Sequence, residues 1–330
     1  MLAKQDVVAI GVLSASIVGL ALLAEGEAPT EFLRFQEGKP GEGKFETAIV
    51  TYGGKGAIEV DLIAAVHIAD AAYYQALQKR FATYDALLYE MIKPRDAEPV
   101  PGARPDNLLS MFQRFLKDIL DLQFQLDSLD YRKPNFVHAD LDPDTFFKLQ
   151  REKGENMLSL FLRLLSRQFE LEAKGQGGKS FGLVDLIMAF SSADKAAALK
   201  LLMARELEHA ELLMAGVDDG DDGKGSVIVG ERNKVAMERL RSAIDGGKKK
   251  IGIFYGGAHM PDFEKRLGQE LGLEKIRVEW ITAWDIKKKG AGRARDAVRR
   301  TKDRPAEAPA PAVEEPVEKP DGASPRLRSF

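Results

Sequence analysis

The sequence predicts an α/β fold in which a mixed central sheet is flanked by helices and interrupted by a large helical insertion. Residues 58–91 read as strand, helix and strand: a β-branched apolar run is followed by apolar residues at helical spacing, and then by the short run DALLYEM. Residues 250–255 form another apolar run that ends in a tight turn before a helix. Residues 45–52 and 57–66 flank a Gly-rich turn and predict a hairpin, so the sheet is expected to include antiparallel strands.

The chain begins with an apolar segment. Residues 7–24 are 18 residues without a charge, which is near the lower limit for a membrane-spanning helix. Lys4 precedes the segment and two glutamates follow it, which favours a cytoplasmic N-terminus and an exported body. We therefore predict that residues 1–24 are a membrane anchor that holds the protein outside the cytoplasm. A cleaved signal sequence, with secretion, is the alternative. Residues 25–44 are polar and rich in Gly and Pro, and are predicted to be a linker.

The middle of the chain has mainly helical periodicity. An amphipathic helix is expected at residues 108–129, and a further strand or extended segment at residues 135–141. A helix should begin at Asp142 and Pro143, because an N-cap aspartate here precedes a proline at the first helical position. These features define a helical insertion at about residues 105–216.

The rest of the domain returns to the sheet. A helix is expected at residues 231–244, followed by the strand at 250–255 and a last strand at 276–284, so that the α/β domain spans residues 45–286. Residues 287–330 are first basic and then rich in Pro, Ala and Glu, and this tail is predicted to be disordered.

Composition narrows the possible functions. The formal net charge is −3 and the pI is about 6.0, so the chain as a whole has no electrostatic attraction to nucleic acid, and no nucleic-acid partner is expected. The chain has no cysteine, which excludes disulfides and a thiolate nucleophile. Any metal ion must be held by His, Asp or Glu.

Two of the four histidines lie where a predicted strand passes into a predicted helix. His67 and His259 both follow small residues, and Glu90 ends the strand after His67. Because a right-handed crossover brings the carboxyl ends of two parallel strands to one edge, we expect His67 and Glu90 to be neighbours. Two imidazoles and a carboxylate are a frequent ligand set for catalytic zinc and other divalent metals. The same residues could instead carry out metal-free hydrolysis, with a histidine as general base and Glu90 orienting it.

A second group of residues also has metal-binding types. His138 lies close to Asp140 and Asp142 in the segment HADLDPD, although helix capping already explains Asp142. This group is the weaker of the two candidates for a metal site.

Four motifs together resemble the TraB/PrgY/GumN and TIKI family, which is related to the erythromycin esterases and ChaN-like proteins. They are A-A-V-His67-I-A-D-A-x-Y-Y-x-x-L-Q, Y-D-A-L-L-Y-Glu90, Glu231-Arg232-Asn233-K and F-Y-G-G-A-His259-M-P-D-F. The family is marked by two Gly-x-x-His motifs, a glutamate that ends the strand after the first, and an arginine ahead of the second. The second motif matches fully, whereas the first has Ala64 in place of glycine.

The resemblance implies both a fold and an activity. It implies an α/β core, metal-dependent peptidase activity as in TIKI proteins, and roles connected with pheromone inhibition as in bacterial members. Carried over by motif, the site is His67, Glu90, Arg232 and His259. His67, Glu90 and His259 would hold a divalent metal, namely manganese, cobalt or zinc. Glu90 and Arg232 would be catalytic, and Arg232 would bind a carboxylate or stabilise developing negative charge.

The sequence thus predicts a membrane-anchored, exported, metal-dependent hydrolase that acts on a peptide or protein. Two alternatives remain. One is a pocket protein that sequesters a peptide signal, a metal or heme without turnover, and the other is a metal-free esterase. The sequence leaves the oligomeric state open.

Overall fold

The computed structural model describes residues 30–54, 56–94, 120–155, 183–215 and 226–287, together with residues 166, 169, 173 and 174. The expected anchor at residues 1–24 and the tail beyond residue 287 lie outside these ranges, so both stay predictions. None of the helices within the described ranges is both long enough and apolar enough to cross a membrane.

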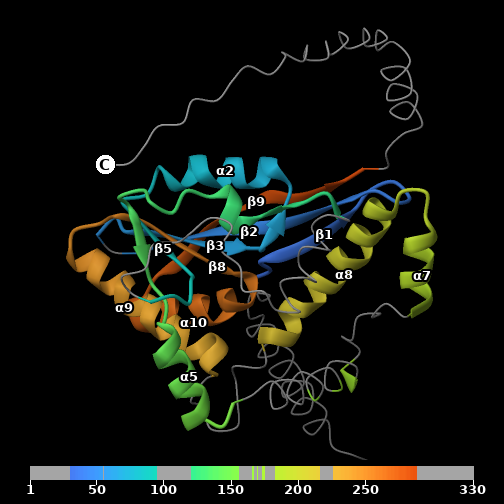
Figure 1. The fold of residues 1–330 in the computed structure, drawn as a ribbon. Coiled ribbons are helices and arrows are strands. Elements are labelled where there is room, and N and C mark those ends of the chain that lie inside the picture. The colour runs from blue at the N-terminus through green and yellow to red at the C-terminus, as the bar shows by residue number, and fades with distance from the viewer. Residues whose placement is uncertain are drawn as a thin grey trace, which may run out of the picture. The chain divides into compact units, whose positions relative to one another are not determined.

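The described residues contain a seven-stranded mixed sheet, which confirms the predicted α/β fold class (Figure 1). One part of it is antiparallel: β2 pairs with β1, with β3 and with β9. The other part is parallel, in the order β3, β8, β5 and β7. The strands are β1 Leu33–Glu37, β2 Gly43–Gly53, β3 Glu59–Ala65, β5 Ala86–Tyr89, β7 Phe136–His138, β8 Lys250–Gly256 and β9 Glu274–Ile286.

Helices lie on both faces of this sheet. Figure 1 shows α2 on one face and α9 and α10 on the other. The α-helices are α2 Ala71–Phe81, α4 Gln125–Ser128, α5 Pro143–Glu152, α7 Leu183–Ser191, α8 Lys195–Ala215, α9 Arg232–Asp245 and α10 Met260–Leu271. A π-helical turn, Val227–Glu231, leads into α9, and a 3₁₀ turn, Gly257–His259, leads into α10. A two-stranded sheet is formed by β4 Ile68–Ala69 and β6 Gln123–Phe124.

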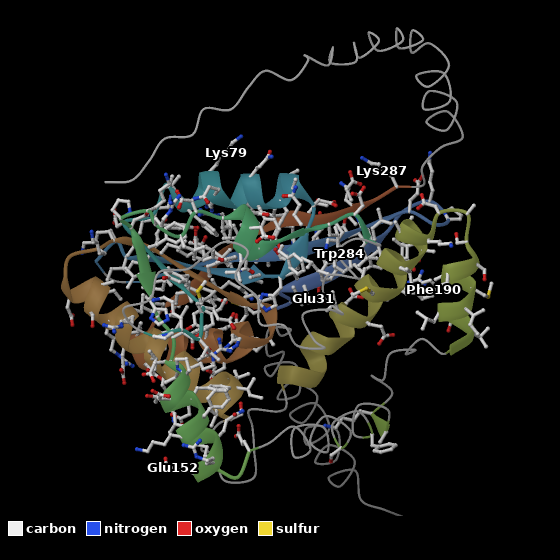
Figure 2. The ribbon with its side chains drawn as sticks, in the orientation of Figure 1. Glu31, Lys79, Glu152, Phe190, Trp284 and Lys287 are labelled. Carbon is white, nitrogen blue, oxygen red and sulfur yellow. The ribbon has the colours of Figure 1, made fainter. Side chains whose placement is uncertain are left out.

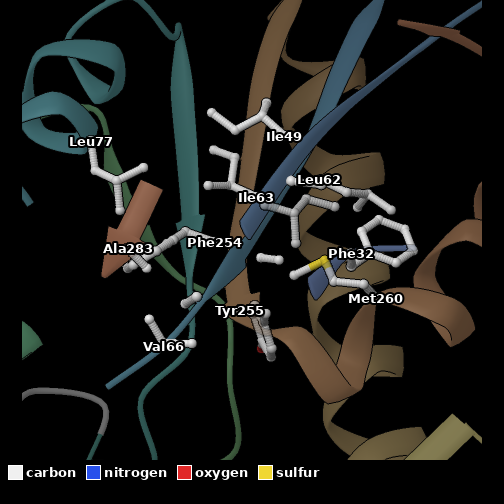
Figure 3. Close-up of a cluster of buried hydrophobic side chains, with 14 of the residues drawn as sticks. Phe32, Ile49, Leu62, Ile63, Val66, Leu77, Phe254, Tyr255, Met260 and Ala283 are labelled. Atoms are coloured by element: carbon white, nitrogen blue, oxygen red, sulfur yellow. The ribbon is translucent and has the colours of Figure 1, made fainter. Parts of the chain in front are cut away.

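The core fills both sides of the parallel strands. Leu62 and Ile63 are consecutive residues of β3, so their side chains point to opposite faces of the strand. Both are fully buried, so both faces of β3 are covered. In Figure 3, Leu62 lies close to Phe32 and Met260, whereas Ile63 lies close to Ile49. Such strands, buried on both faces, are typical of α/β sheets. In Figure 2, the side chains of Lys79 and Lys287 lie on the outside of the domain.

The order of the strands differs from the order that the strand–helix–strand pattern predicts. β3 and β5 are joined through α2 as expected, but β8 lies between them and is parallel to both. The crossover therefore skips one position in the sheet, and a strand from nearly 200 residues later fills it. Local periodicity identifies strands, but it does not say which strand from farther along the chain pairs with them.

Two predicted boundaries were wrong. The predicted linker contains a strand, because Leu33–Glu37 pairs with β2, and β2 itself begins at Gly43. The helix expected at residues 108–129 does not continue to its predicted end, because Asp121 has a φ of 55° and β6 follows it. Its earlier part lies outside the described residues. Within the insertion expected at residues 105–216, the strand predicted at residues 135–141 is present as β7, and it belongs to the central sheet. Pairing partners distant in sequence decided each of these points.

Candidate functional site

Four neighbouring parallel strands end at the same edge of the sheet. They are β3, β8, β5 and β7, and a polar side chain follows each of them: His67, His259, Glu90 and Asp140, respectively. Ligands of open α/β folds bind outside this carboxyl edge. His67 and Glu90 do reach one edge, but their strands are not adjacent as predicted. His259 comes from the strand between them.

Arg232 holds this edge together from the start of α9. Its Nε and Nη2 donate to the two carboxylate oxygens of Asp140, at 2.9 and 2.6 Å, and Nη2 also donates to Oε1 of Glu90 at 2.7 Å. Nη1 lies 3.5 Å from the Ile228 carbonyl oxygen and 3.4 Å from Nε2 of His259. The guanidinium carries five N–H groups, so these acceptors use all of them. The π-helical turn just before Arg232 is a feature frequent at functional sites.

Glu90 is an ionised carboxylate that is nearly enclosed by the protein. Its Oε1 accepts from Arg232, and its Oε2 accepts the backbone N–H of Gly256 at 2.7 Å. Burial alone would raise its pKa. The nearby His259, Arg232 and His67 and the Gly256 N–H outweigh burial and lower the pKa of Glu90 to about 2. Glu90 therefore acts as an acceptor and a fixed negative charge, because a carboxylate with so low a pKa is a weak base.

Asn233 sets the proton position on His259. The amide nitrogen of Asn233 donates to the His259 carbonyl oxygen at 3.1 Å and to Asp262 at 2.7 Å, which leaves its Oδ1 facing Nδ1 of His259 at 2.7 Å. An amide oxygen only accepts, so Nδ1 carries the proton and Nε2 bears the lone pair. Nε2 lies 3.7 Å from Oε1 of Glu90. Burial lowers the pKa of His259, so its imidazole is neutral at pH 7.

His67 is the exposed member of the group. His67 is exposed to solvent, whereas His259 is only 4% exposed. The backbone of this corner is fixed by two buried tyrosines of α2: Tyr73 donates to the Ala64 carbonyl oxygen at 3.1 Å and Tyr74 to that of Val66 at 3.0 Å. The tyrosine pair of the first motif thus holds the end of β3, where Ala64 replaces the glycine of the family motif.

His138, Asp140 and Asp142, the second candidate group for a metal site, each have a different partner in the structure. His138 directs Nε2 at the Met91 carbonyl oxygen, 2.7 Å away, and Asp140 binds Arg232. Asp142 caps α5 by accepting from the Thr145 backbone N–H at 2.9 Å, as predicted. Sequence reasoning considered Asp140 as a metal ligand and did not predict its ion pair with Arg232. It also missed the role of Asn233, although both residues lie in segments that it singled out.

Histidine and carboxylate side chains are suitable ligands for a divalent metal, but among the described residues their positions at this edge do not form a metal site. Within the described ranges, no group of three or more His, Asp or Glu side chains is placed to hold a metal ion. No family model matches this chain, and no curated protein does. The metal and the resemblance to the TraB and TIKI family both stay predictions. A divalent ion bound between Glu90 and His259 would have to share these residues with the guanidinium of Arg232, which contacts both.

Helix α8 lies against the turn between β8 and α10 that carries His259. It contacts the 3₁₀ turn Gly257–His259, and its Lys200 lies 3.2 Å from Oδ1 of Asp70, three residues after His67. Lys200 is 8% exposed, so this ion pair is largely shielded from water. A cavity of about 280 Å³ lies elsewhere, at the amino ends of β3 and β8, where Glu59 and Lys250 line it. The buried polar network around Arg232 lies at the opposite end of these strands, at their carboxyl edge.

Proposed function

We propose that this chain is a hydrolase of amide or ester bonds that acts at the carboxyl edge of the parallel strands. One observation carries the proposal: four adjacent strand ends direct two imidazoles and two carboxylates to one edge, where one buried guanidinium fixes Glu90 and lies against His259. A structural ion pair needs neither the exposed His67 nor the tautomer that Asn233 imposes on His259.

In the proposed reaction His67 accepts a proton from water, because it is the imidazole that solvent and substrate reach. The resulting hydroxide adds to the substrate carbonyl carbon, and the protonated His67 then returns the proton to the leaving amine or alcohol. The negative charge of Glu90 stabilises the imidazolium between these steps. The products are a carboxylic acid and an amine or alcohol, so the overall reaction consumes one water.

Arg232 has a positioning role in this proposal. Each of its N–H groups already has an acceptor within the protein, so no donor is left for a substrate carboxylate. This differs from the role that the resemblance implied. His259, which is almost completely buried, stabilises the arrangement of Glu90 and Arg232 from the other side.

Our proposals for the substrate class, the metal and the location of the protein rest on the sequence alone. We propose a peptide or protein substrate from the resemblance, and an exported body held at a membrane by residues 1–24 from their uncharged apolar composition. If a divalent ion is used, His67, Glu90 and His259 would hold it. It would supply a polarised carbonyl or an activated water.

The test is hydrolysis of a peptide library and of simple esters by the full chain in detergent. We expect turnover to fall by roughly a hundredfold or more in His67→Ala, the size of effect found for a general base. His259→Ala should fall similarly, whereas the matched control His138→Gln, a histidine outside this network, should retain activity. Activity that persists in both alanine variants would refute the proposal.

Two further measurements separate the alternatives. Loss of activity with a chelator, restored by Mn²⁺, Co²⁺ or Zn²⁺, would support a metal-dependent hydrolase. Turnover that persists in chelator would support the metal-free esterase. Stoichiometric capture of a peptide without cleavage would instead identify a sequestering protein.

A further inference from the structure

The outer edge of β9 is not used by the proposed hydrolase. β9 follows one edge of β2 from Gly43 to Gly53, while β1 and β3 share the other edge of β2. Among the described residues, β2 is the one strand that pairs with β9. In the part of the chain that the structure describes, the other side of β9 has one backbone hydrogen bond, near its end, where the Asp70 N–H donates to the Ala283 carbonyl oxygen at 2.9 Å. An open edge of this kind is a template for adding another strand.

The side chains at the start of β9 alternate between apolar and charged residues, so this edge is only partly protected by charge. Val278 is 42% exposed and Ile276 is 59% exposed, although both are apolar. Arg277 is also exposed, and within the described ranges it makes no ion pair. The pairing of β9 with β2 is regular from Arg277 to Thr282, with irregularities on either side. A regular, partly apolar edge is an aggregation hazard unless something covers it.

The sequence of β9 is complementary to itself when two copies run antiparallel. We propose that β9 pairs with β9 of a second copy of this chain, with the two-fold axis at Val278. In this register Val278 faces Val278, and Arg277 of each copy faces Glu279 of the other. An isologous contact of this kind closes after two copies and covers the outer edge of β9 in both.

The charges select this register over its neighbours. A two-fold axis one residue earlier would place Arg277 opposite Arg277, and one residue later would place Glu279 opposite Glu279. Like charges directly opposite each other destabilise a strand pair. Glu279 already lies 3.2 Å from Arg80, and its side chain is 46% exposed, so its carboxylate can accept from a second guanidinium as well.

The contact should be modest in strength. One ribbon of this length buries less surface than the roughly 1,600 Å² of a standard interface, so we expect a dissociation constant in the micromolar range. A shared membrane would raise the effective concentration of the two copies.

The absence of cysteine from the natural chain gives a direct test. The Cβ atoms of residues directly opposite in an antiparallel pair lie about 4.5–5.5 Å apart, and a small shift brings them to the roughly 3.5–4.5 Å of a disulfide, so Val278→Cys should form a symmetric disulfide under mild oxidation. The product would have twice the 36.4 kDa mass of the chain on a non-reducing gel. Phe147→Cys on α5, which is 54% exposed, is the control. We expect roughly tenfold less disulfide dimer from it.

Charge reversal provides a second, independent test. Arg277→Glu alone and Glu279→Arg alone should each weaken the dimer, by roughly tenfold to a hundredfold. A mixture of the two variants restores opposite charges at both contacts, and so should recover a dimer in sedimentation of the full chain in detergent. Unchanged circular dichroism would verify that each variant is folded.

Three results would overturn the proposal. The first is a wild-type chain that stays monomeric at about 100 µM, a concentration well above the expected micromolar dissociation constant. The second is equal disulfide formation by the Phe147→Cys and Val278→Cys variants. The third is charge-reversed variants that self-associate like the wild type. None of these results depends on hydrolysis, so the dimer and the proposed hydrolase can fail separately.

Discussion

Replacing Arg232 by methionine should destabilise this protein more than replacing any exposed arginine. Arg232 is 7% exposed, and the carboxylate side chains that it compensates are also buried, with Asp140 at 0% and Glu90 at 15%. Arg232→Met preserves much of the side-chain volume but leaves two enclosed carboxylates without a counter-charge. Because the group is shielded from water, little of its interaction is lost to solvent screening.

The expected cost follows from this geometry. Breaking a buried pair by removing one partner costs about 3–5 kcal/mol. With a urea dependence of about 3 kcal/mol per M for a domain of this size, the midpoint of unfolding should fall by about 1–1.7 M. The control is Arg205→Met, whose pair with Glu37 is 50% and 67% exposed and should contribute at most about 1 kcal/mol.

The cost should also depend on pH. In the wild type, the pKa of Glu90 is about 2, below its unfolded value, so this carboxylate adds stability above about pH 4 that is lost as the pH falls toward 2. Without the guanidinium, burial favours the protonated carboxyl, and the variant regains stability in acid. The difference between the two proteins should therefore be largest near pH 7.

The measurement is urea unfolding of both full-length variants and the wild type in detergent, followed by circular dichroism at pH 7 and pH 4. A loss at pH 7 no greater than that of Arg205→Met would refute the reasoning. So would a loss that does not change between the two pH values.

Three further predictions follow from other parts of the structure. Gly252→Ala would bring a Cβ to 2.7 Å from the Leu87 side chain, so thermal unfolding should show a loss of about 1–3 kcal/mol; an unchanged melting temperature would contradict this packing. Lys200→Met should speed amide hydrogen exchange in α8, because it removes the ion pair to Asp70, and unchanged exchange would mean that apolar packing alone holds α8. Because burial keeps the pKa of His259 below its unfolded value, stability should fall as the pH drops below about 6.5, and His259→Gln should flatten this slope in urea unfolding.

Local sequence patterns predicted much of this fold. The hairpin of β2 and β3, the helix α2 and the short strands β5 and β7 follow from runs of apolar residues and their spacing. The Asp142 cap of α5 follows from an aspartate before a proline. β1 was missed because its five residues lie in a polar Gly- and Pro-rich stretch, and their pairing with β2 alone makes them a strand.

The sequence by itself determined which residues end the strands, and hence that His67, Glu90 and His259 belong to one edge. Only the tertiary structure decided their order, because β8 enters between β3 and β5 from far along the chain. It also decided the partners of Arg232, since Glu90 and Asp140 lie 142 and 92 positions away from it. The physical reason is that periodicity records which face of an element is buried, whereas strand pairing and buried ion pairs depend on contacts between residues far apart in the chain.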